Sequence, residues 1–579
     1  MKRCPQCNRV ETDEGLKFCR VDGATLVDES SPIGSESATA QLGSAVANEV
    51  HATILPYNTS ANVNRAVAPT TVLPQPPVTS TTHELAKPKR RTTAIVAIAI
   101  AAVGIISAVV VISYLSRKGN TSIESIAIMP FQNQSNDPNS DYLSDGITEN
   151  IINSLSQLPN LKVMARTTVF RYKGRDADAQ KVGEELGVAA VLTGRVLKQG
   201  DTLQIQADLV RVSDGSEIWG NKYSRKLADV FAMQSDLAKE ISDRLRIQIG
   251  GVERERLAKH ATENTEAYEL YLKGRYHYFK GTESDMRQAS NYYQQAIDKD
   301  PNFARAYVGL ADSYGTASTY LLPPNQAYAK VKDAALRALQ IDDGLGEAHA
   351  TWGTYKFFYE RDWRGAEAEF KRAIALNPNS PDAATWYSFY LAATQRFDEA
   401  IAQATRAKQL DPLSIVANVG VAESYYQSRQ YDLAIDAFRK CLELDPQNVY
   451  AHELLGVAYQ KKGMQAQAIA EFEKAVQIDS SPGVISFLGW GYGAAGRADD
   501  ARKVLSQLEQ IGKQRYVSPY NNALVFAGLG DQDHTFEWLN KADEERNDFL
   551  VYLKCEPMFD SVRSDPRFNE FIRRIGLTP

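Results

Sequence analysis

Apolar and polar residues follow three different patterns along this chain of 579 residues. Between Ala94 and Leu115, the chain contains no charged side chain. From Leu203 to Leu209, apolar residues alternate one by one with polar ones. After residue 262, apolar and small residues recur at helical spacing in repeated units of one length. These patterns predict a membrane-length helix, a half-buried strand and an array of helical repeats.

The uncharged run has the length of a membrane-spanning helix. At about 1.5 Å of rise per residue, the run from Ala94 to Leu115 covers the roughly 30 Å hydrocarbon core of a bilayer. A buried core helix is the alternative, but the run has no amphipathic face and is flanked by Thr, Pro and charged residues. We therefore predict one transmembrane helix at 94–115.

The charges beside this helix predict its orientation. Four basic residues precede it and two follow closely, namely Lys87, Lys89, Arg90 and Arg91 before the run and Arg117 and Lys118 after it. Because cytoplasmic flanks carry the excess of Lys and Arg, the N-terminus is expected in the cytoplasm. The sequence thus predicts a single-pass protein of the inner (cytoplasmic) membrane, with its C-terminal domains on the periplasmic, extracytoplasmic side.

Residues 121–250 have the pattern of a small α/β domain. Strand-like runs lie at 123–131, 161–165, 188–197, 203–209 and 218–223, and helix-like runs at 145–158, 177–186 and 230–249. Turns are expected at Gln199-Gly200-Asp201 and Ser213-Asp214-Gly215. An order of βαβαβββα predicts a mixed sheet.

This region resembles the TolB amino-terminal-like domain. The phrases that carry the resemblance are SIAIMPFQNQSND, DYLSDGITENIINSLSQLPNLKVMART, ELGVAAVLTGRV and DGSEIWGNKYSRKLADVFAMQ. That domain precedes tetratricopeptide (TPR) repeats in many bacterial proteins, some of which carry an adenylate cyclase, a protein kinase or a DNA-binding domain. The resemblance implies a noncatalytic adaptor fold and names no ligand.

The repeats after residue 262 resemble the TPR family. Asn377-Pro378, Asp411-Pro412 and Asp445-Pro446 recur at a constant spacing of about 34 residues, as do the small residues Ala366, Ala400, Ala434 and Ala468. The segment YDLAIDAFRKCLELDP also has aromatic, small and Pro residues at the family's positions. We predict about seven or eight repeats within 262–550. Residues 551–579 are predicted to cap the last repeat with an apolar set, Phe559, Phe568, Phe571 and Ile572.

The TPR pattern predicts which residues face the concave groove. They are Asp382, Thr385, Glu423, Tyr426, Gln427, Tyr450, Glu453, Gln460 and Lys461. This set lacks the repeated Lys and Asn of TPRs that clamp a terminal carboxylate, and it suits an extended or helical peptide of a protein partner. The alternative is that these are solvated helix residues with no partner.

Residues 1–27 have the spacing of a zinc ribbon. Cys4-x2-Cys7 precedes Cys19-x2-Asp22, and thiolates and a carboxylate are acceptable tetrahedral zinc ligands. The segment resembles the zinc-ribbon family at the N-termini of many bacterial membrane proteins, but has Asp22 in place of the fourth cysteine. Asp22 or water completes the site, or the site has decayed; three free thiols are the alternative. Residues 28–93 read as a disordered linker with a basic juxtamembrane end.

Other functions find little support in the sequence. A net charge of -6, and balanced charges around the ribbon, argue against nucleic-acid binding. Gly491-x-Gly493-x-x-Gly496 does not follow a strand, as a dinucleotide site requires, and fits the turns of a repeat. The seven histidines are scattered, and the sequence contains no Walker loop, kinase signature or serine-nucleophile elbow. We predict no catalytic residues, no organic cofactor and no small-molecule substrate.

The sequence therefore predicts a multidomain chain, in which a TPR α-solenoid follows a zinc ribbon, a transmembrane helix and a small α/β domain. The favoured function is a membrane-anchored scaffold that binds protein partners at the cell envelope. The alternative is a transmembrane relay that couples the outer TPR and TolB-like region to the cytoplasmic ribbon. An unrecognised activity of the α/β domain is a third reading, which no residue supports.

Overall fold

The structure is a computed structural model of the chain. It describes residues 123–577, apart from 136–139, 159, 176–177, 227–228, 246–260, 281 and 321, and three short strands near the N-terminus. Two compact units are present, Met1–Val96 and Ala97–Pro579. In the first unit, β1 (Lys2–Arg3) pairs antiparallel with both β2 (Val10–Glu11) and β3 (Val27–Asp28).

Several predicted features lie outside the described residues. They are the proposed zinc ligands Cys4, Cys7, Cys19 and Asp22, the linker beyond residue 28, and the predicted transmembrane helix at 94–115. In the part of the chain that is described, no helix combines the length and the apolar character needed to cross a membrane.

The α/β domain contains a mixed sheet, as the element order predicts. Its order is β6-β4-β7-β8-β9, with β5 also paired to β7. Strand β4 is parallel to β6 and β7, whereas β7, β8 and β9 are antiparallel. The strands are β4 (Ser125–Ile128), β5 (Gln132–Asn133), β6 (Lys162–Val163), β7 (Ala190–Gln199), β8 (Thr202–Arg211) and β9 (Glu217–Lys226).

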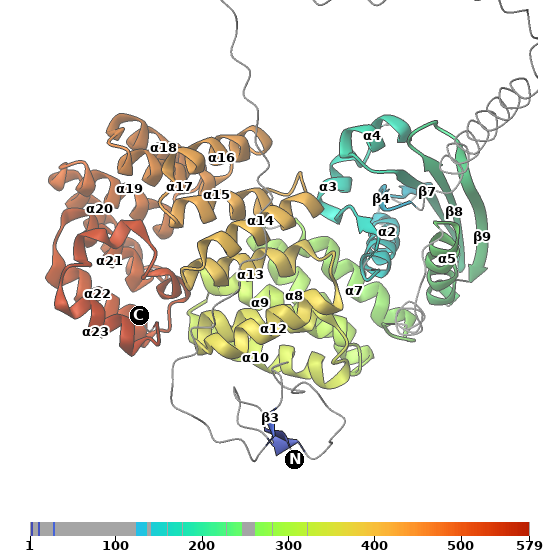
Figure 1. Ribbon diagram of the computed structural model, residues 1–579, viewed down its shortest axis with the longest axis horizontal. Coiled ribbons are helices and arrows are strands. Elements are labelled where there is room, and N and C mark those ends of the chain that lie inside the picture. Colours follow the sequence, from blue (N-terminus) through green and yellow to red (C-terminus); the bar gives the residue numbers. More distant parts are fainter. Residues whose placement is uncertain are drawn as a thin grey trace, which may run out of the picture. The chain divides into compact units, whose positions relative to one another are not determined.

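Helices pack against this sheet (Figure 1). Helix α2 (Asp141–Ser156) contacts α5 (Val230–Arg244), and α4 (Ala179–Leu186) contacts β7 and β8. Along β8, Leu203, Ile205, Ala207 and Leu209 are each 0% exposed, which confirms the predicted alternation. Gly200 has a φ of 57° in the turn between β7 and β8, a conformation that glycine adopts without strain.

Two details of this domain differ from the prediction. The second strand spans only Lys162–Val163, not 161–165. Residues 166–172, for which nothing was predicted, form the short helices α3 (Arg166–Val169) and η2 (Phe170–Tyr172). Both differences lie at the edge of the domain that contacts the repeats, where contacts far away in the sequence decide the backbone conformation.

The described residues between 265 and 544 form eight antiparallel helix pairs. The inner helix of each pair comes first in the sequence. The pairs are α7 (Thr265–Tyr278) with α8 (Glu283–Lys299), α9 (Ala304–Tyr320) with α10 (Pro324–Ile341), α11 (Gly346–Tyr355), continued by the π-helical turn η4 (Lys356–Glu360), with α12 (Trp363–Leu376), α13 (Pro381–Ala393) with α14 (Phe397–Leu410), α15 (Ile415–Gln427) with α16 (Tyr431–Leu444), α17 (Val449–Lys461) with α18 (Gln465–Ile478), α19 (Pro482–Ala494) with α20 (Ala498–Gly512), and α21 (Pro519–Leu529) with α22 (Gln532–Glu544).

Small residues allow the helices of a pair to approach closely. Ala366, Ala400, Ala434 and Ala468, which recur once in each repeat, are all 0% exposed. A Cβ atom on Gly456 of α17 would lie 2.6 Å from the ring of Phe472 on α18. Glycine is therefore needed at this position, because that distance is shorter than van der Waals contact.

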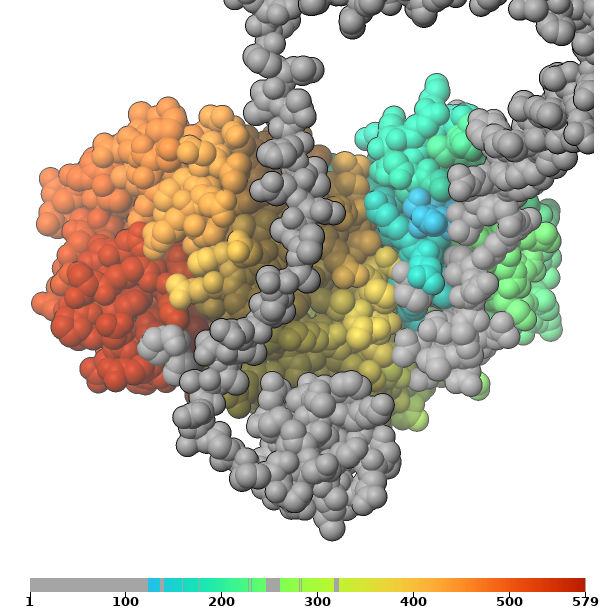
Figure 2. All heavy atoms as spheres, viewed as in Figure 1, coloured from blue at the N-terminus to red at the C-terminus, as the bar shows by residue number. Residues whose placement is uncertain are grey.

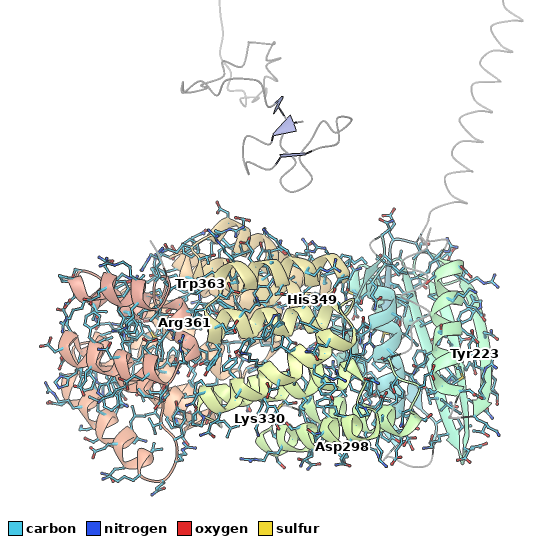
Figure 3. All side chains as sticks on the ribbon, turned by 90° about the horizontal axis from the view of Figure 1, so that it is seen from below. Tyr223, Asp298, Lys330, His349, Arg361 and Trp363 are labelled. Carbon is cyan, nitrogen blue, oxygen red and sulfur yellow. The ribbon has the colours of Figure 1, made fainter. Side chains whose placement is uncertain are left out.

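The space-filling and side-chain views show how the array and the α/β domain meet. In Figure 2, the α/β domain (cyan to green) adjoins the gold-coloured middle of the array. Figure 3 shows Tyr223 on the sheet and His349, Arg361 and Trp363 within the array.

His349 is a structural residue, since its Nδ1 lies 2.7 Å from Glu369 and its Nε2 lies 2.9 Å from the Asp343 carbonyl.

Candidate partner-binding groove

The candidate site is the inner face of α13, α15 and α17, which carry all nine predicted groove residues. Ser380, Ser414 and Asn448 begin these helices, and each side chain accepts a hydrogen bond from a backbone N–H of the first turn. Such caps satisfy an N–H that the helix itself leaves unpaired. The caps recur with the period of the repeats, so the three inner helices begin in the same way and present equivalent positions to the groove.

The chain fills this groove with its own C-terminal segment, residues 548–577. The segment consists of η5 (Asp548–Tyr552), η6 (Pro557–Val562) and α23 (Pro566–Arg574). It was predicted to cap the last repeat, and η6 does contact α21 and α22. However, η5 also contacts η4 and α13. The segment therefore reaches from the last repeat back to the middle of the array.

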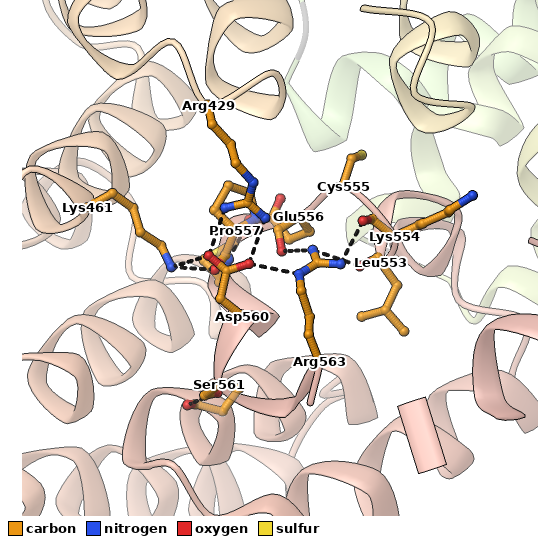
Figure 4. Close-up of polar contacts among 12 residues, drawn as sticks. Arg429, Lys461, Leu553, Lys554, Cys555, Glu556, Pro557, Asp560, Ser561 and Arg563 are labelled. Atoms are coloured by element: carbon orange, nitrogen blue, oxygen red, sulfur yellow. Dashed lines mark hydrogen bonds and ion pairs between the residues drawn. The ribbon is translucent and has the colours of Figure 1, made fainter. Parts of the chain in front are cut away.

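A carboxylate of the segment, Asp560, binds three cations (Figure 4). It accepts hydrogen bonds from Arg429 at 2.7 and 2.8 Å, from Lys461 at 2.9 Å and from Arg563 at 2.8 Å. Burial alone would raise the pKa of Asp560, but these cations lower it well below its ordinary value. Arg429 and Lys461 belong to the repeats, so the network joins the segment to the array.

Further polar contacts fix the segment along the inner helices. The hydroxyl of Tyr426 donates to Glu556. Lys461 donates to the Pro557 carbonyl at 2.6 Å, and Trp490 Nε1 donates to the Met558 carbonyl at 3.0 Å. These donors come from α15, α17 and α19, so three successive repeats hold the same short stretch.

Apolar residues of the segment are buried in clusters with residues of the array. Five of them are 0% exposed, namely Leu550, Val551, Leu553, Phe559 and Val562. Full burial of one such side chain stabilises a fold by roughly 1.5–3 kcal/mol. Release of the segment would expose all of them to water. We conclude that the segment is a permanent part of the folded array.

The nine predicted groove residues lie in different environments as a result. Thr385, Glu423, Tyr426, Gln427 and Glu453 are buried, Tyr450, Gln460 and Lys461 are partly exposed, and Asp382 is exposed. Desolvation by the surrounding protein raises the pKa of Asp382, although the residue as a whole is exposed. Of the nine side chains, that of Asp382 is thus the most accessible to a partner.

Two buried glutamates of the groove have no neighbouring cation among the interactions recorded for the described residues. Burial raises the pKa of Glu423 to about 8, with a further contribution from the charge of Glu556. Burial also raises the pKa of Glu453 to about 8. Gln427 Nε2 donates to Glu423 Oε1 at 2.7 Å. Both glutamates are therefore mainly protonated near neutral pH.

The α/β domain contacts another part of the array, the turns before α13 and α15. The amide of Asn379, in the turn before α13, donates to the carbonyls of Ser156, Leu158 and Leu161 at 3.0, 3.1 and 2.9 Å. Thr168 of α3 donates to Asp411 at 2.6 Å, so the domain also binds the next turn of the array.

An ion-pair cluster joins the domain to the first repeat. Glu149 of α2 is 5% exposed. It accepts a hydrogen bond from Arg275 Nε of α7 at 2.8 Å and lies 3.1 Å from Arg166 Nε. Burial alone would raise the pKa of Glu149, but Arg275 and Arg166 lower it. Together with Asn379 and Thr168, this cluster makes the domain and the array one packed unit.

Sequence reasoning did not find Arg429, Glu556 or Asp560, which organise the filled groove. Arg429 lies in the turn after an inner helix, at a φ of 65°, where the repeat pattern marks no binding position. Glu556 and Asp560 lie in a segment that was interpreted as a cap. The two acidic residues, Glu556 and Asp560, stand among apolar residues from 550 to 562, and this mixture was the available signal that the stretch binds along a mixed surface.

The described residues contain no group of three or more His, Cys, Asp or Glu side chains that could hold a metal ion. Cys441 and Cys555 are buried free thiols. Burial raises the pKa of the Cys441 thiol to about 12, and raises that of Cys555 as well. Both cysteines therefore act as packing residues here, and neither has the thiolate character of a nucleophile.

Family models match two parts of the chain. The second domain of the HilA/YgeH-like transcriptional regulators matches residues 122–240. Three models of TPR repeats match residues 356–415, 422–463 and 449–482. With the helix pairs described above, these matches confirm that the chain contains TPR repeats. The TolB-like resemblance of the α/β domain stays a prediction.

A curated relative is similar to part of the chain. It is putative adenylate cyclase 3 of Rhizobium meliloti (strain 1021), which is 35% identical over 187 residues. The match covers 32% of this chain and 32% of the relative, so this chain spans about a third of the relative's length.

Solved structures of helical repeat proteins also resemble the chain. PilF of Pseudomonas aeruginosa is 18% identical, with a TM-score of 0.30, over 37% of this chain and 94% of PilF. YrrB, a TPR protein with an unusual peptide-binding site, is 20% identical, with a TM-score of 0.24, over 32% of this chain and 92% of YrrB. Likenesses at this level assign no ligand or partner to the chain.

Proposed function

We propose that this protein is a membrane-anchored scaffold whose TPR array binds protein partners at the cell envelope. The observation that carries the proposal is the array of eight helix pairs, three parts of which match TPR family models. Stacked repeats create extended surfaces that bind proteins or peptides. The uncharged run at 94–115 supports anchoring to a membrane.

The filled groove limits where a partner binds. Tyr426 of α15 and Lys461 of α17 bind the C-terminal segment, so these side chains are not free for an incoming peptide. Two side chains at the start of inner helices stay exposed, Asp382 on α13 and Val416, which is 53% exposed, on α15. We place the partner on the surfaces that the segment leaves open, including these two positions.

The proposal assigns no catalysis to the chain. The relative named as an adenylate cyclase is similar over 32% of its length only, so its activity is not carried over. An assay of the purified full chain with ATP and Mg²⁺ should yield no cyclic AMP above a boiled control. Cyclic AMP formation in proportion to the amount of protein would contradict the noncatalytic assignment.

Two further parts of the proposal rest on the sequence alone. The N-terminus is proposed to lie in the cytoplasm, so a reporter that is active only in the cytoplasm should be silent when fused after Pro579. Residues 1–27 are proposed to bind one zinc ion through Cys4, Cys7 and Cys19, with Asp22 or water as the fourth ligand. Metal analysis of the full chain should find zinc that Cys19→Ser removes.

Site-specific photocrosslinking tests the scaffold function most directly. A crosslinker replaces Val416 in the full chain in native membranes, and a matched crosslinker replaces Lys440, which is exposed on the outer helix α16. We expect one reproducible protein adduct from position 416 that is absent at position 440. If position 416 gives no adduct above background, the scaffold proposal is wrong.

A further inference from the structure

One cavity remains open beside the C-terminal segment. Its volume is about 520 Å³, within the range of about 300–1,000 Å³ typical of ligand pockets. The lining comes from the turn after α13 and from the segment itself, and consists of Gln395, Lys554, Arg563, Phe568, Asn569, Ile572 and Arg573. Six of the seven lining residues thus belong to the C-terminal segment, and one belongs to the array.

The lining of this cavity is cationic. It includes Lys554, Arg563 and Arg573, and no acidic residue. Arg563 is held rigidly, because its guanidinium donates to Asp560 at 2.8 Å, to the Lys554 carbonyl at 2.7 Å and to the Glu556 carbonyl at 2.8 Å. Because Arg563 is already paired with the Asp560 carboxylate, the charge that the cavity offers to a ligand comes mainly from Arg573. A positive charge in a partly enclosed space favours an anionic ligand.

Arg573 provides the donors that a ligand would use. It is exposed on α23, and within the described part of the chain its recorded hydrogen bond runs from Nε to the Asn569 carbonyl, at 3.2 Å. The two terminal nitrogens are then free to donate to a carboxylate in the bidentate geometry that arginine prefers.

The cavity also has an apolar part. Phe568 and Ile572 are 5% and 4% exposed and belong to the core beneath α23. The guanidinium of Arg563 lies 5.3 Å from the centre of the Phe568 ring. The amides of Gln395 and Asn569 complete the lining and can bond to a peptide backbone. A simple inorganic anion would leave these apolar and amide groups unused.

We propose that this cavity binds an acidic segment of a protein partner, with one or two Asp or Glu carboxylates beside an apolar side chain. The carboxylate would bind Arg573 and face Lys554, and the apolar side chain would lie against Phe568 and Ile572. The inference rests on the proposed scaffold function and adds the chemistry of the partner. The overall charge of -6 argues against nucleic acid as the ligand, because a polyanion would be repelled by the chain as a whole.

Fluorescence anisotropy with the full chain tests this site. The probe is a fluorescein-labelled peptide of sequence Ser-Asp-Glu-Phe-Asp-Gly, and the control peptide carries Asn and Gln in place of Asp and Glu. We expect the acidic peptide to bind at least tenfold more tightly than the control. Arg573→Glu should weaken its binding at least tenfold. Lys440→Glu, which makes the same charge change on α16, should change it less than twofold.

Three outcomes would overturn the inference: equal binding of both peptides, an unchanged affinity in Arg573→Glu, or tighter binding of an oligothymidylate than of the acidic peptide. Melting temperatures of both variants check the fold, and Arg573→Ala replaces Arg573→Glu if the latter unfolds. If crosslinking at position 416 finds a partner while the acidic peptide fails to bind, this inference falls and the scaffold function stands. Conversely, if the acidic peptide binds through Arg573 but crosslinking at position 416 finds no partner, this inference stands and the scaffold function falls.

Discussion

At the scale of single residues, Asp560 shows how a few side chains specify the path of a whole segment. Its carboxylate meets Arg429 and Lys461 of two neighbouring repeats and Arg563 of its own segment. The apolar side chains nearby stabilise the segment through the hydrophobic effect, which is non-directional. The hydrogen bonds of Asp560, in contrast, require a fixed geometry. The network therefore sets the register of the segment along the groove.

Replacement of Asp560 should destabilise the array. Asp560→Ala removes the partner of three cations, and hydrogen bonds to charged groups contribute about 1.5–3 kcal/mol each when protected from solvent. Because the Asp560 side chain is 32% exposed, we expect a total loss of about 1–3 kcal/mol in the free energy of unfolding. The control Asp432→Ala breaks the exposed pair with Lys462 and should cost less than about 0.5 kcal/mol. Urea unfolding that shows equal effects would contradict this role of Asp560.

The buried glutamates predict a dependence of stability on pH. In the folded protein, Glu453 has a pKa of about 8, above its ordinary value of 4.5. The folded state then keeps a proton that the unfolded state releases, so stability falls as the pH rises from 4.5 to 8. The slope is at most about 1.4 kcal/mol per pH unit for one such group.

Glu453→Gln should flatten this pH dependence, because the amide cannot ionise. Relative to the wild type, the variant should gain stability at pH 8 and differ little at pH 5. The control Glu443→Gln, at an exposed position of α16, should keep the wild-type slope. Thermal unfolding between pH 5 and pH 8 measures all three proteins. Identical slopes for the two variants would show that Glu453 is ionised in the folded state.

At the scale of elements, the turns between repeats also hold the α/β domain. Asn379 follows the Asn377-Pro378 signature, and its amide binds three carbonyls at the end of α2 and before β6. Thr168 binds Asp411, the first residue of the next signature. The turn residues recur in each repeat because they connect its helices. In the two turns that contact the α/β domain, they also bind that domain.

Asn379→Ala should loosen this contact, because it leaves three carbonyls without their common donor. We expect faster amide hydrogen exchange at residues 156–163 and a loss of about 1–3 kcal/mol in stability. Gln447→Ala, at the same turn position two repeats later and exposed, should leave the exchange of these residues unchanged. Equal exchange in both variants would mean that Asn379 does not hold the domain.

Most of the fold could be predicted from local patterns in the sequence. The features that could not be predicted depend on contacts between residues far apart in the chain. The burial of Leu203 and Leu209 follows from alternation between neighbouring residues, and the repeat helices follow from spacings within a single repeat. In contrast, Tyr426 and Glu556 bind each other across 130 residues. No period marks such a pair, so the apolar segment was predicted to cover the nearest repeat.

The candidate site could likewise be predicted only in part from the sequence. Its inner helices follow from the repeat pattern, which also placed Glu423 and Tyr426 on the groove side. The covering of this groove by residues 548–577 could not be predicted, because it depends on how far the array curves and on where the chain turns after α22. The zinc ligands and the membrane helix lie outside the described residues and remain predictions.

At the scale of the whole molecule, the array is enclosed by its own chain on two sides. The α/β domain contacts the first repeat and the turns before α13 and α15, and the C-terminal segment fills the inner face from α13 to α21. A partner therefore meets a fixed surface with few open positions, not an empty groove that folds around a peptide. The scaffold proposal and the cationic cavity both depend on this arrangement.

Hydrogen exchange of the full chain tests the filled groove most directly. If residues 548–577 are a permanent part of the fold, amides 550–562 should exchange as slowly as those in the middle of α17. The exposed turn at 513–516 serves as the fast reference within the same molecule. Exchange of 550–562 at the rate of that turn would show that the segment leaves the groove, and would contradict the account given for the array.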